Sequence, residues 1–347
     1  MASIAEDDRG HEPAASQGII FASTGDAYTD ITYQAAESLK RWDTHRPIVL
    51  YTDKPRPLGP FSSVEVLERP WRRSKLDAMA LSPFEQTLYL DSDVLVRAPL
   101  DEIFAVLDRF EFAAAQDRDI NGGQEGRYWR QPLPPSFPQY NSGVVGFRKT
   151  PRVTALIDAW RGHVREENLP YDQPVLRELL WLSEVRVATL PEAFNLVRFQ
   201  QMAAWSHRDL APRIVHAQRL HYHISRPDVP RVTEEGALLG PGLRRMARLL
   251  DASDAHRAAL LGAPSPRMTP VGFGLTRILA ASELVIGKLS ATATTAIRRV
   301  IRQLGLGREQ ISEEAKQERR VREEAAKNAP CPAPIARPRK EPSNADV

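Results

Sequence analysis

Short apolar runs alternate with helical patterns along most of the chain, and this alternation restricts the fold more than any other feature. The run "GIIFAST" (18–24) is followed by a helical pattern at 30–42 and by a second apolar run, "RPIVLYTD" (46–53). Apolar runs of this length suit buried strands, and the helical segments between them suit crossover connections. The pattern predicts an α/β domain with a mostly parallel sheet.

The alternation continues beyond these first elements. We expect further strands at 64–70, 112–117, 143–147, 185–191 and within 213–223, and helices at 74–84, 100–110, 151–167 and 171–182. Helical spacing makes Trp160, Leu180 and Trp181 candidate core residues. The polar segment 118–140 is long for a loop inside a compact domain, so we expect it to face substrate, with a disordered insertion as the alternative. Tyr128 and Trp129 within it are candidates for stacking on an acceptor.

Several expected strands end in small polar or acidic residues. In an open parallel sheet, ligands bind beyond the carboxyl ends of the strands, so these side chains are expected to meet at one rim. They are Ser23, Thr24, Thr52, Asp53, Asp91, Asp93 and Asp117.

The stretch "TLYLDSDVLV" (87–96) carries the most specific of these strand ends. Asp91 and Asp93 are two residues apart directly after a buried run, so both can reach one ion if the chain turns there. Carboxylate-rich ligand sets suit Mg²⁺ or Mn²⁺, which also hold substrate phosphates. Two alternatives remain for this motif alone, solvated loop carboxylates and the Asp-X-Asp motif of haloacid-dehalogenase-type phosphatases.

The order of four further motifs along the chain favours one of these interpretations of Asp91 and Asp93, the metal site. Lys75 lies one helix before the acidic pair, and "YNSGVVGFRKTP" (140–151), "YDQPVL" (171–176) and "IVHA" (214–217) follow it. With these motifs the sequence resembles family-8 glycosyltransferases of the GT-A fold, the group of glycogenin and bacterial lipopolysaccharide sugar transferases. The resemblance covers roughly residues 18–225. It implies a GT-A, Rossmann-like domain that transfers a hexose from a nucleoside-diphosphate sugar, most simply a UDP-sugar, to a hydroxyl with retention of configuration.

The resemblance also implies roles for individual residues. The cation, Mn²⁺ or Mg²⁺, is expected on Asp91, Asp93 and His216. The nucleotide is expected to contact Ala22, Ser23, Thr24, Thr52, Asp53, Lys75, Ser92, Ser142 and Gly143. The transferred sugar is expected beside the catalytic candidates Asn141, Asp172 and Gln173. Gly143 would let the backbone approach the sugar closely.

One part of the sequence departs from the family pattern. Family-8 enzymes often follow the metal-binding histidine with a glycine and then Lys-Pro-Trp, whereas this chain reads "HAQRLHYHIS" from residue 216. Arg219 is a candidate to replace the missing lysine. His221 and His223 are alternative metal ligands to His216.

The C-terminal part of the chain has a different composition. We expect a catalytic domain at 18–232, short packing helices at 233–266, a basic amphipathic helix within 267–306 and a charged, Pro-rich tail at 307–347, with a disordered lead at 1–17. Over 272–306 aliphatic residues cluster on one helical face and basic residues on the other. That helix is expected to pack on the body or on a second copy, or to lie on an anionic membrane.

Bulk composition limits the remaining possibilities. The chain has 347 residues, 42% hydrophobic and 26% charged, typical of a globular protein with a sizeable core. Its one cysteine, Cys331, allows no intrachain disulfide, and no signal-peptide pattern or 18-residue apolar run occurs. We therefore expect a cytoplasmic protein, with peripheral binding to the inner face of the plasma membrane as the alternative. The slightly acidic body argues against nucleic-acid binding. The acceptor, a glycan, a lipid-linked sugar or a protein, is open, and a scaffold without catalysis is the non-enzymatic alternative.

Overall fold

The computed structural model describes residues 16–118, 128–226, 228–263, 273–274 and 276–282. All of them belong to one compact unit. The predicted N-terminal lead, apart from its last residues, lies outside the described residues. So do the centre of the loop at 118–140, the tail at 307–347 and most of the amphipathic helix.

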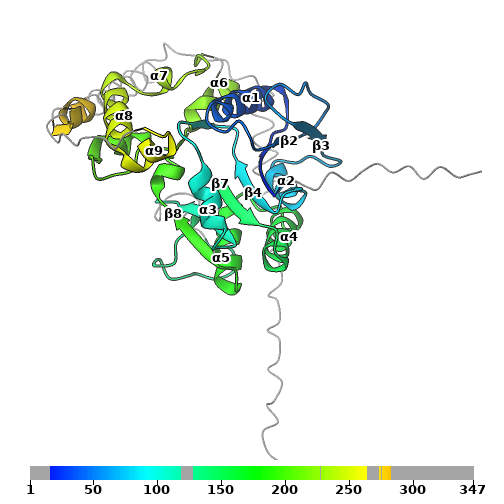
Figure 1. Ribbon diagram of the computed structural model, residues 1–347. Coiled ribbons are helices and arrows are strands. Elements are labelled where there is room, and N and C mark those ends of the chain that lie inside the picture. The colour runs from blue at the N-terminus through cyan, green and yellow to red at the C-terminus, as the bar shows by residue number, and fades with distance from the viewer. Residues whose placement is uncertain (1–15, 119–127, 227, 264–272, 275, 283–347) are drawn as a thin grey trace, which may run out of the picture. The chain divides into compact units, whose positions relative to one another are not determined.

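A seven-stranded sheet forms the centre of the described part (Figure 1). Its spatial order is β3-β2-β1-β4-β7-β6-β8, and all neighbouring pairs are parallel except the two that involve β7. The strands are β1 (Gln17–Ala22), β2 (Ile48–Thr52), β3 (Ser63–Val66), β4 (Gln86–Leu90), β6 (Phe112–Gln116), β7 (Tyr140–Arg148) and β8 (Val187–Leu190). The predicted α/β class with a mostly parallel sheet is confirmed.

Strand β7 runs against every other strand of this sheet. It pairs antiparallel with both β4 and β6, and it begins at Tyr140, three residues before the predicted strand at 143–147. Because its direction is reversed, its first residues lie at the rim where the other strands end. The segment Asn141–Gly143 is therefore part of a strand and not of the preceding loop.

Helices cover both faces of the sheet. One face packs against α1 (Asp26–Lys40) and α3 (Asp101–Leu107), and the other against α2 (Ser74–Ala80), α4 (Pro151–Glu166) and α5 (Gln173–Leu182). Trp160 and Leu180 are buried, as predicted. The prediction for Trp181 was wrong: next to the buried Leu180, its side chain is 46% exposed and lies edge-on to Phe137 on a face of α5 that the core does not cover.

A two-stranded antiparallel sheet lies beside the main sheet. It consists of β5 (Val94–Val96) and β9 (Ile214–His216), and its register places Val94 opposite His216. The remaining elements are η1 (Glu192–Phe194), η2 (Phe199–Ala204), η3 (Gln218–His221), α6 (Tyr222–Ser225), α7 (Glu235–Leu238), α8 (Pro241–Ser253) and α9 (Ala255–Leu260). Leu95 and Val215 share a hydrophobic cluster with Met246 and Leu250 of α8.

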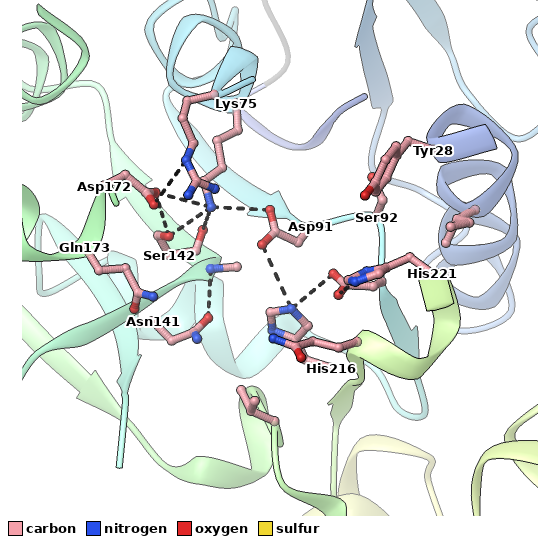
Figure 2. A pocket seen from close by; sticks show the side chains of 16 residues that line it. Tyr28, Lys75, Asp91, Ser92, Asn141, Ser142, Asp172, Gln173, His216 and His221 are labelled. Atoms are coloured by element: carbon pink, nitrogen blue, oxygen red, sulfur yellow. Dashed lines mark hydrogen bonds and ion pairs between the residues drawn. The ribbon is translucent and has the colours of Figure 1, made fainter. Parts of the chain in front are cut away.

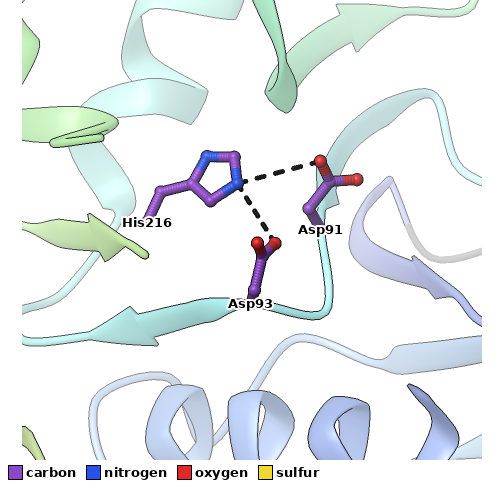
Figure 3. A group of neighbouring side chains, drawn as sticks. All are labelled: Asp91, Asp93 and His216. Carbon is purple, nitrogen blue, oxygen red and sulfur yellow. Dashed lines mark ion pairs between the residues drawn. The ribbon is translucent and has the colours of Figure 1, made fainter. Parts of the chain in front are cut away.

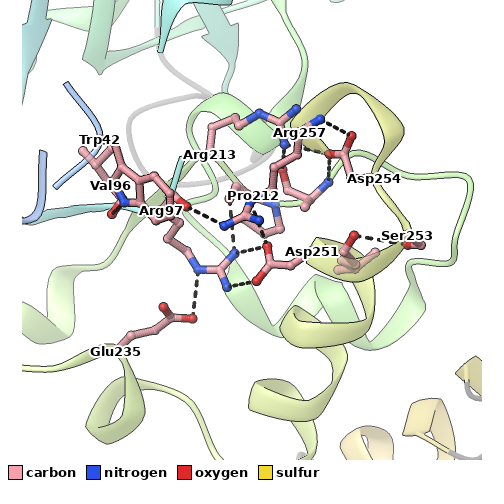
Figure 4. A network of polar contacts seen from close by, with 12 residues as sticks. Trp42, Val96, Arg97, Pro212, Arg213, Glu235, Asp251, Ser253, Asp254 and Arg257 are labelled. Atoms are coloured by element: carbon pink, nitrogen blue, oxygen red, sulfur yellow. Dashed lines mark hydrogen bonds and ion pairs between the residues drawn. The ribbon is translucent and has the colours of Figure 1, made fainter. Parts of the chain in front are cut away.

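Buried ion pairs join the two-stranded sheet to the helices that follow it (Figure 4). Arg213 is fully buried; its guanidinium lies 2.7 Å from Asp254 Oδ2 and 2.9 Å from Glu102 Oε2. Arg97, at the end of β5, pairs with Asp251 and Glu235, each at 2.9 Å. The Arg213 pair holds the pKa of Asp254 below its ordinary value, against the raising effect of burial. Arg213, which directly precedes the strand that ends in His216, is therefore fixed by Asp254 between α8 and α9 and by Glu102 of α3.

Among the residues that the structure describes, none of the helices combines the length and apolarity that a membrane crossing requires.

Removing the carboxylate of Asp254 should destabilise this fold. Asp254→Ala leaves the guanidinium of Arg213 buried without its nearest partner, and breaking a buried pair typically costs about 3–5 kcal/mol. We expect the free energy of unfolding, measured by urea denaturation, to fall by that order. Asp158→Ala, which removes an exposed partner of Arg161, is the control and should change it by less than about 1 kcal/mol. Equal losses in the two variants would contradict a supporting role of the buried pair.

Candidate active site

A cavity of about 310 Å³ opens at the rim where the strands of the main sheet end (Figure 2). Most of its lining is polar or charged, and it contains most of the residues that the sequence motifs singled out. The lining residues are Tyr28, Ile31, Arg73, Lys75, Asp91, Ser92, Asp93, Asn141, Ser142, Gly143, Asp172, Gln173, Val197, His216, Gln218 and His221.

Different elements carry these side chains to one place. Asp91 follows the end of β4 and Asp93 precedes β5, so the chain turns between them as predicted. The reversed β7 delivers Asn141 to the same rim, and the first turn of α5 delivers Gln173. His216 ends β9, and its neighbour Ala217 donates its backbone N–H to the carbonyl of Asp93 at 2.9 Å. That register holds the imidazole beside the carboxylates.

Asp91, Asp93 and His216 form a compact group of metal-ligand type (Figure 3). His216 Nε2 lies 3.1 Å from Asp93 Oδ1 and 4.0 Å from Asp91 Oδ2, and one ligand atom from each residue lies within 4.8 Å of the others. His221 also contacts Asp93, with 3.2 Å between Nδ1 and Oδ2. His223 does not line the cavity.

Gly143 makes room for this group. A Cβ atom built on Gly143 would lie 2.8 Å from Asp91 Oδ2 and would overlap the ring of His216. The structure thus gives the glycine a role that the sequence did not suggest, since the space is taken by metal-ligand side chains. Two carboxylates and an imidazole packed over a glycine fit a divalent cation such as Mn²⁺ or Mg²⁺.

Opposing charges dominate the electrostatics at the ligand group. Burial by itself would raise the pKa of Asp93, but the imidazoles of His216 and His221 hold it far below its usual range. Burial would lower the pKa of His216, yet the Asp93 and Asp91 carboxylates raise it above its ordinary value. Without a cation the site therefore favours a protonated His216 between charged aspartates, and a cation has to displace that proton.

A second charged cluster surrounds Asp172. Its Oδ2 lies 3.4 Å from Lys75 Nζ and accepts a 2.8 Å hydrogen bond from Ser142 Oγ, while its Oδ1 lies 3.6 Å from Arg73 Nε. Lys75 also donates to Ser142 Oγ at 2.9 Å and lies 3.5 Å from Asp91 Oδ1. Burial raises the pKa of Asp172, but Lys75 and Arg73 shift it below its ordinary value. Lys75 thus joins the Asp172 cluster to the cation ligands.

The nucleoside candidates lie partly in an adjoining cavity of about 360 Å³. Ala22, Ser23 and Thr24 line it, together with residues that it shares with the first cavity: Tyr28, Arg73, Lys75, Asp91 and Ser92. Thr52 and Asp53 line neither of these two cavities. Asp53 instead accepts the backbone N–H of Gly25 at 3.0 Å and fixes the loop after β1. Arg219 is exposed and lines neither cavity.

The sequence analysis missed several residues of the site, and three of them bear directly on its chemistry. Tyr28 and Arg73 line both cavities, and Asn195 contacts His216 from outside them. Helix α1 begins at Asp26, earlier than predicted, so Tyr28 falls on its first turn. Arg73 stands two residues before Lys75, where a search around the lysine could have found it. Asn195 has no local signal, because its position depends on pairing with a distant strand.

The loop candidates lie on the α4 side of the domain. The ring of Trp129 is covered by Arg130, 3.9 Å from the ring centroid, and packs against His163, with Nε1 donating to Glu167 at 2.9 Å. These contacts anchor Trp129 on α4. Tyr128 is 60% exposed.

The chain resembles several solved glycosyltransferase structures. Among them are glycosyltransferase GlyE from Streptococcus pneumoniae TIGR4 (20% identity, 58% of this chain, 54% of that chain, TM-score 0.41) and galactosyltransferase LgtC in complex with donor and acceptor sugar analogs (18% identity, 67% of this chain, 95% of that chain, TM-score 0.42). The bifunctional glycosyltransferase WbbM matches at 14% identity, over 59% of this chain and 46% of that chain, with a TM-score of 0.39.

The match with GlyE spans only about half of that protein. No protein-family model matches the sequence, and no curated protein matches it significantly.

Filling the space over Gly143 should prevent cation binding. In Gly143→Ala the new methyl group overlaps the His216 ring and crowds Asp91, so the three ligands cannot converge. For wild type we expect Mn²⁺ at 100 times its Kd to stabilise the fold by about 2.7 kcal/mol, seen as a rise in Tm, and for the variant no rise. Gly162→Ala on α4, where the nearest atom is 3.9 Å away, is the control and should keep the full response. A normal Mn²⁺ response of Gly143→Ala would contradict the site.

Cation affinity should also depend on pH. Because the pKa of His216 is raised in the cation-free protein, its imidazole becomes protonated as the pH falls, and Nε2 loses its lone pair. Titration calorimetry with Mn²⁺ should give an association constant that falls by up to about tenfold per pH unit below that pKa. In His216→Gln, weak residual binding should vary less over the same range. Constant affinity of wild type between pH 8 and pH 6 would argue against ligation by His216.

Proposed function

We propose that this chain is a metal-dependent glycosyltransferase of the GT-A, family-8 type. It would transfer a hexose from a nucleoside-diphosphate sugar, most simply a UDP-sugar, to a hydroxyl acceptor with retention of configuration. The observation that carries the proposal is the first cavity, whose lining combines the candidate cation ligands with side chains suited to binding hydroxyl groups. Lys75 contacts one residue of each group, Asp91 and Asp172.

The cation ligands suit the leaving group of such a donor. Asp91, Asp93 and His216 would hold Mn²⁺ or Mg²⁺, which when bound neutralises the charge of a diphosphate as the glycosidic bond breaks. Lys75 and Arg73 are positioned to add positive charge at the same place, since both line the two cavities. Ser92, whose hydroxyl lies 2.7 Å from Thr32 Oγ1, lines both cavities beside Asp91.

The other end of the cavity suits the sugar. Gln173 Oε1 is buried and has no hydrogen-bond partner among the described residues, so a donating hydroxyl of the sugar would satisfy it. Asn141 and Asp172 lie beside it in the same cavity. A site with such groups rejects analogues that lack the matching hydroxyl. Asp172 and Gln173 are our candidates for the residues nearest to the anomeric carbon, and we assign no covalent nucleophile.

The adjoining cavity suits the nucleoside. Ala22, Ser23 and Thr24 line it at the end of β1, and Tyr28 offers a 44% exposed ring between the two cavities. An aromatic ring at this point can stack on a base. Thr52 and Asp53 would act there through the loop after β1, which Asp53 fixes at Gly25.

A membrane or a second copy of the chain is proposed as a partner of residues 272–306. Only 273–274 and 276–282 of this segment lie among the described residues, and they are helical. Ile278 is 67% exposed and Leu279 42%, while Phe273 and Ala280 are buried. Flotation with anionic liposomes, with and without residues 267–347, tests the membrane partner; equal flotation of both proteins would exclude residues 267–347 as the anchor.

Donor hydrolysis tests the function directly. With UDP-hexoses and Mn²⁺ we expect slow release of UDP, abolished by EDTA and reduced at least 100-fold in Asp93→Asn, because the cation loses a charged ligand. Gln173→Ala should mainly raise the KM or lower kcat for one preferred sugar. Asp158→Asn, on the surface of α4, is the control. Release of phosphate from a monoester would favour a phosphatase, and no turnover with intact donor binding would favour a scaffold.

A further inference from the structure

Asn195 lies behind the imidazole of His216, on the side away from the aspartates. It is 3% exposed, and its Oδ1 lies 2.9 Å from His216 Nδ1. The backbone fixes this position, because Leu196 donates to the carbonyl of Ile214 at 2.9 Å and His216 donates to that of Leu196 at 3.1 Å. Asn195 therefore stands beside β9 like a residue of a neighbouring strand.

A backbone amide determines how the nearby side-chain amides are oriented. The N–H of Gly143 can only donate, and it points at Asn141 Oδ1 at 2.9 Å (Figure 2). Asn141 Nδ2 accordingly faces a carboxylate oxygen, Asp117 Oδ2, at 3.2 Å. The second contact of Asn141 Oδ1, at 2.9 Å, is with Asn195 Nδ2, so Asn195 presents its nitrogen to Asn141 and its oxygen to His216.

This chain of donors and acceptors fixes the histidine. An amide oxygen can only accept, so His216 Nδ1 must carry a proton. Nε2 is then the nitrogen that remains for ligation, and it is the one that faces Asp93 and Asp91. We propose that Asn195 is a positioning residue, which holds the neutral His216 in the Nδ1–H tautomer and so keeps Nε2 available to a cation. The inference rests on the cation site of the proposed function.

The carboxylates favour the opposite tautomer. Asp93 Oδ1 lies 3.1 Å from Nε2 and would accept a hydrogen bond from a protonated Nε2. Without a hydrogen-bond acceptor at Nδ1, the neutral ring would carry its proton on Nε2. A cation could then bind Nε2 only after that proton had moved. Partners on the far side of a metal-binding histidine commonly affect metal affinity by about 10- to 100-fold.

Cation affinity of Asn195 variants gives the first test. In Asn195→Leu, which has no acceptor, we expect Mn²⁺ to bind about 10- to 100-fold more weakly in titration calorimetry at pH 8. Asn195→Asp keeps an oxygen for Nδ1 and should recover most of the affinity. Thr189→Val, on β8, is the matched control, because it removes a 3.0 Å hydrogen bond to Tyr140 of β7 and should bind Mn²⁺ like wild type. Circular dichroism and Tm establish that each variant is folded.

The tautomer itself gives the second test, and it needs neither metal nor substrate. Nitrogen NMR of ¹⁵N-histidine protein at about pH 9, with His216 assigned by comparison with His216→Gln, should show a protonated Nδ1 and an unprotonated Nε2 in wild type and Asn195→Asp. In Asn195→Leu the proton should move towards Nε2. A shift in tautomer distinguishes positioning from a general loss of stability.

The outcomes separate the two proposals. A folded Asn195→Leu protein with the wild-type tautomer and with Mn²⁺ affinity within twofold of wild type would overturn the role of Asn195. If that variant does not fold, Asn195→Ala replaces it with the same expectation, and the same result in that protein would overturn the role. A wild-type protein that binds no Mn²⁺ would instead overturn the proposed function, while the NMR of the metal-free protein would still decide the tautomer.

Discussion

The crowding of three carboxylates in one cavity, two of them buried, is the constraint on which the rest of the site depends. Asp91, Asp93 and Asp172 would repel one another and lose hydration there unless cations or donors compensate each of them. The fold provides these partners from separate elements: Lys75 and Arg73 from the start of α2, and His216 from the end of β9. A bound divalent cation would replace the proton of His216 as a source of compensating positive charge. This compensation allows the pair Asp91 and Asp93 to lie at the end of an apolar strand.

Local pattern was sufficient for the elements and for most of the cavity. The strands and helices of the main sheet lie close to their expected ranges, because buried strands and amphipathic helices impose periods that a sequence displays directly. The cation ligands and Lys75 were found because each stands in a short motif. These residues lie at the edge of the main sheet where the sequence led us to expect them. Their chemical roles remain predictions.

The features that the sequence did not reveal all depend on tertiary contacts. The reversed direction of β7 brings Asn141, near the start of that strand, to the rim where the other strands end, and no local pattern distinguishes a parallel from an antiparallel neighbour. Asn195 and His216 stand 21 residues apart in the chain and meet only through backbone pairing beside β9. Trp181 has helical spacing suited to the core, yet its side chain is 46% exposed, because the elements around α5 decide which of its faces is covered.

The tether between Arg213 and Asp254 has a consequence for how the protein can be divided. Strand β9 has three residues, too few to hold His216 rigidly by themselves. It depends on Asp254, between α8 and α9, and its partner strand β5 depends on Asp251 of α8. A shortened expression fragment that ends just after His221 would retain every residue that lines the cavity. It would nevertheless lose the support that keeps β9 in register, so the smallest useful fragment should extend past Leu260.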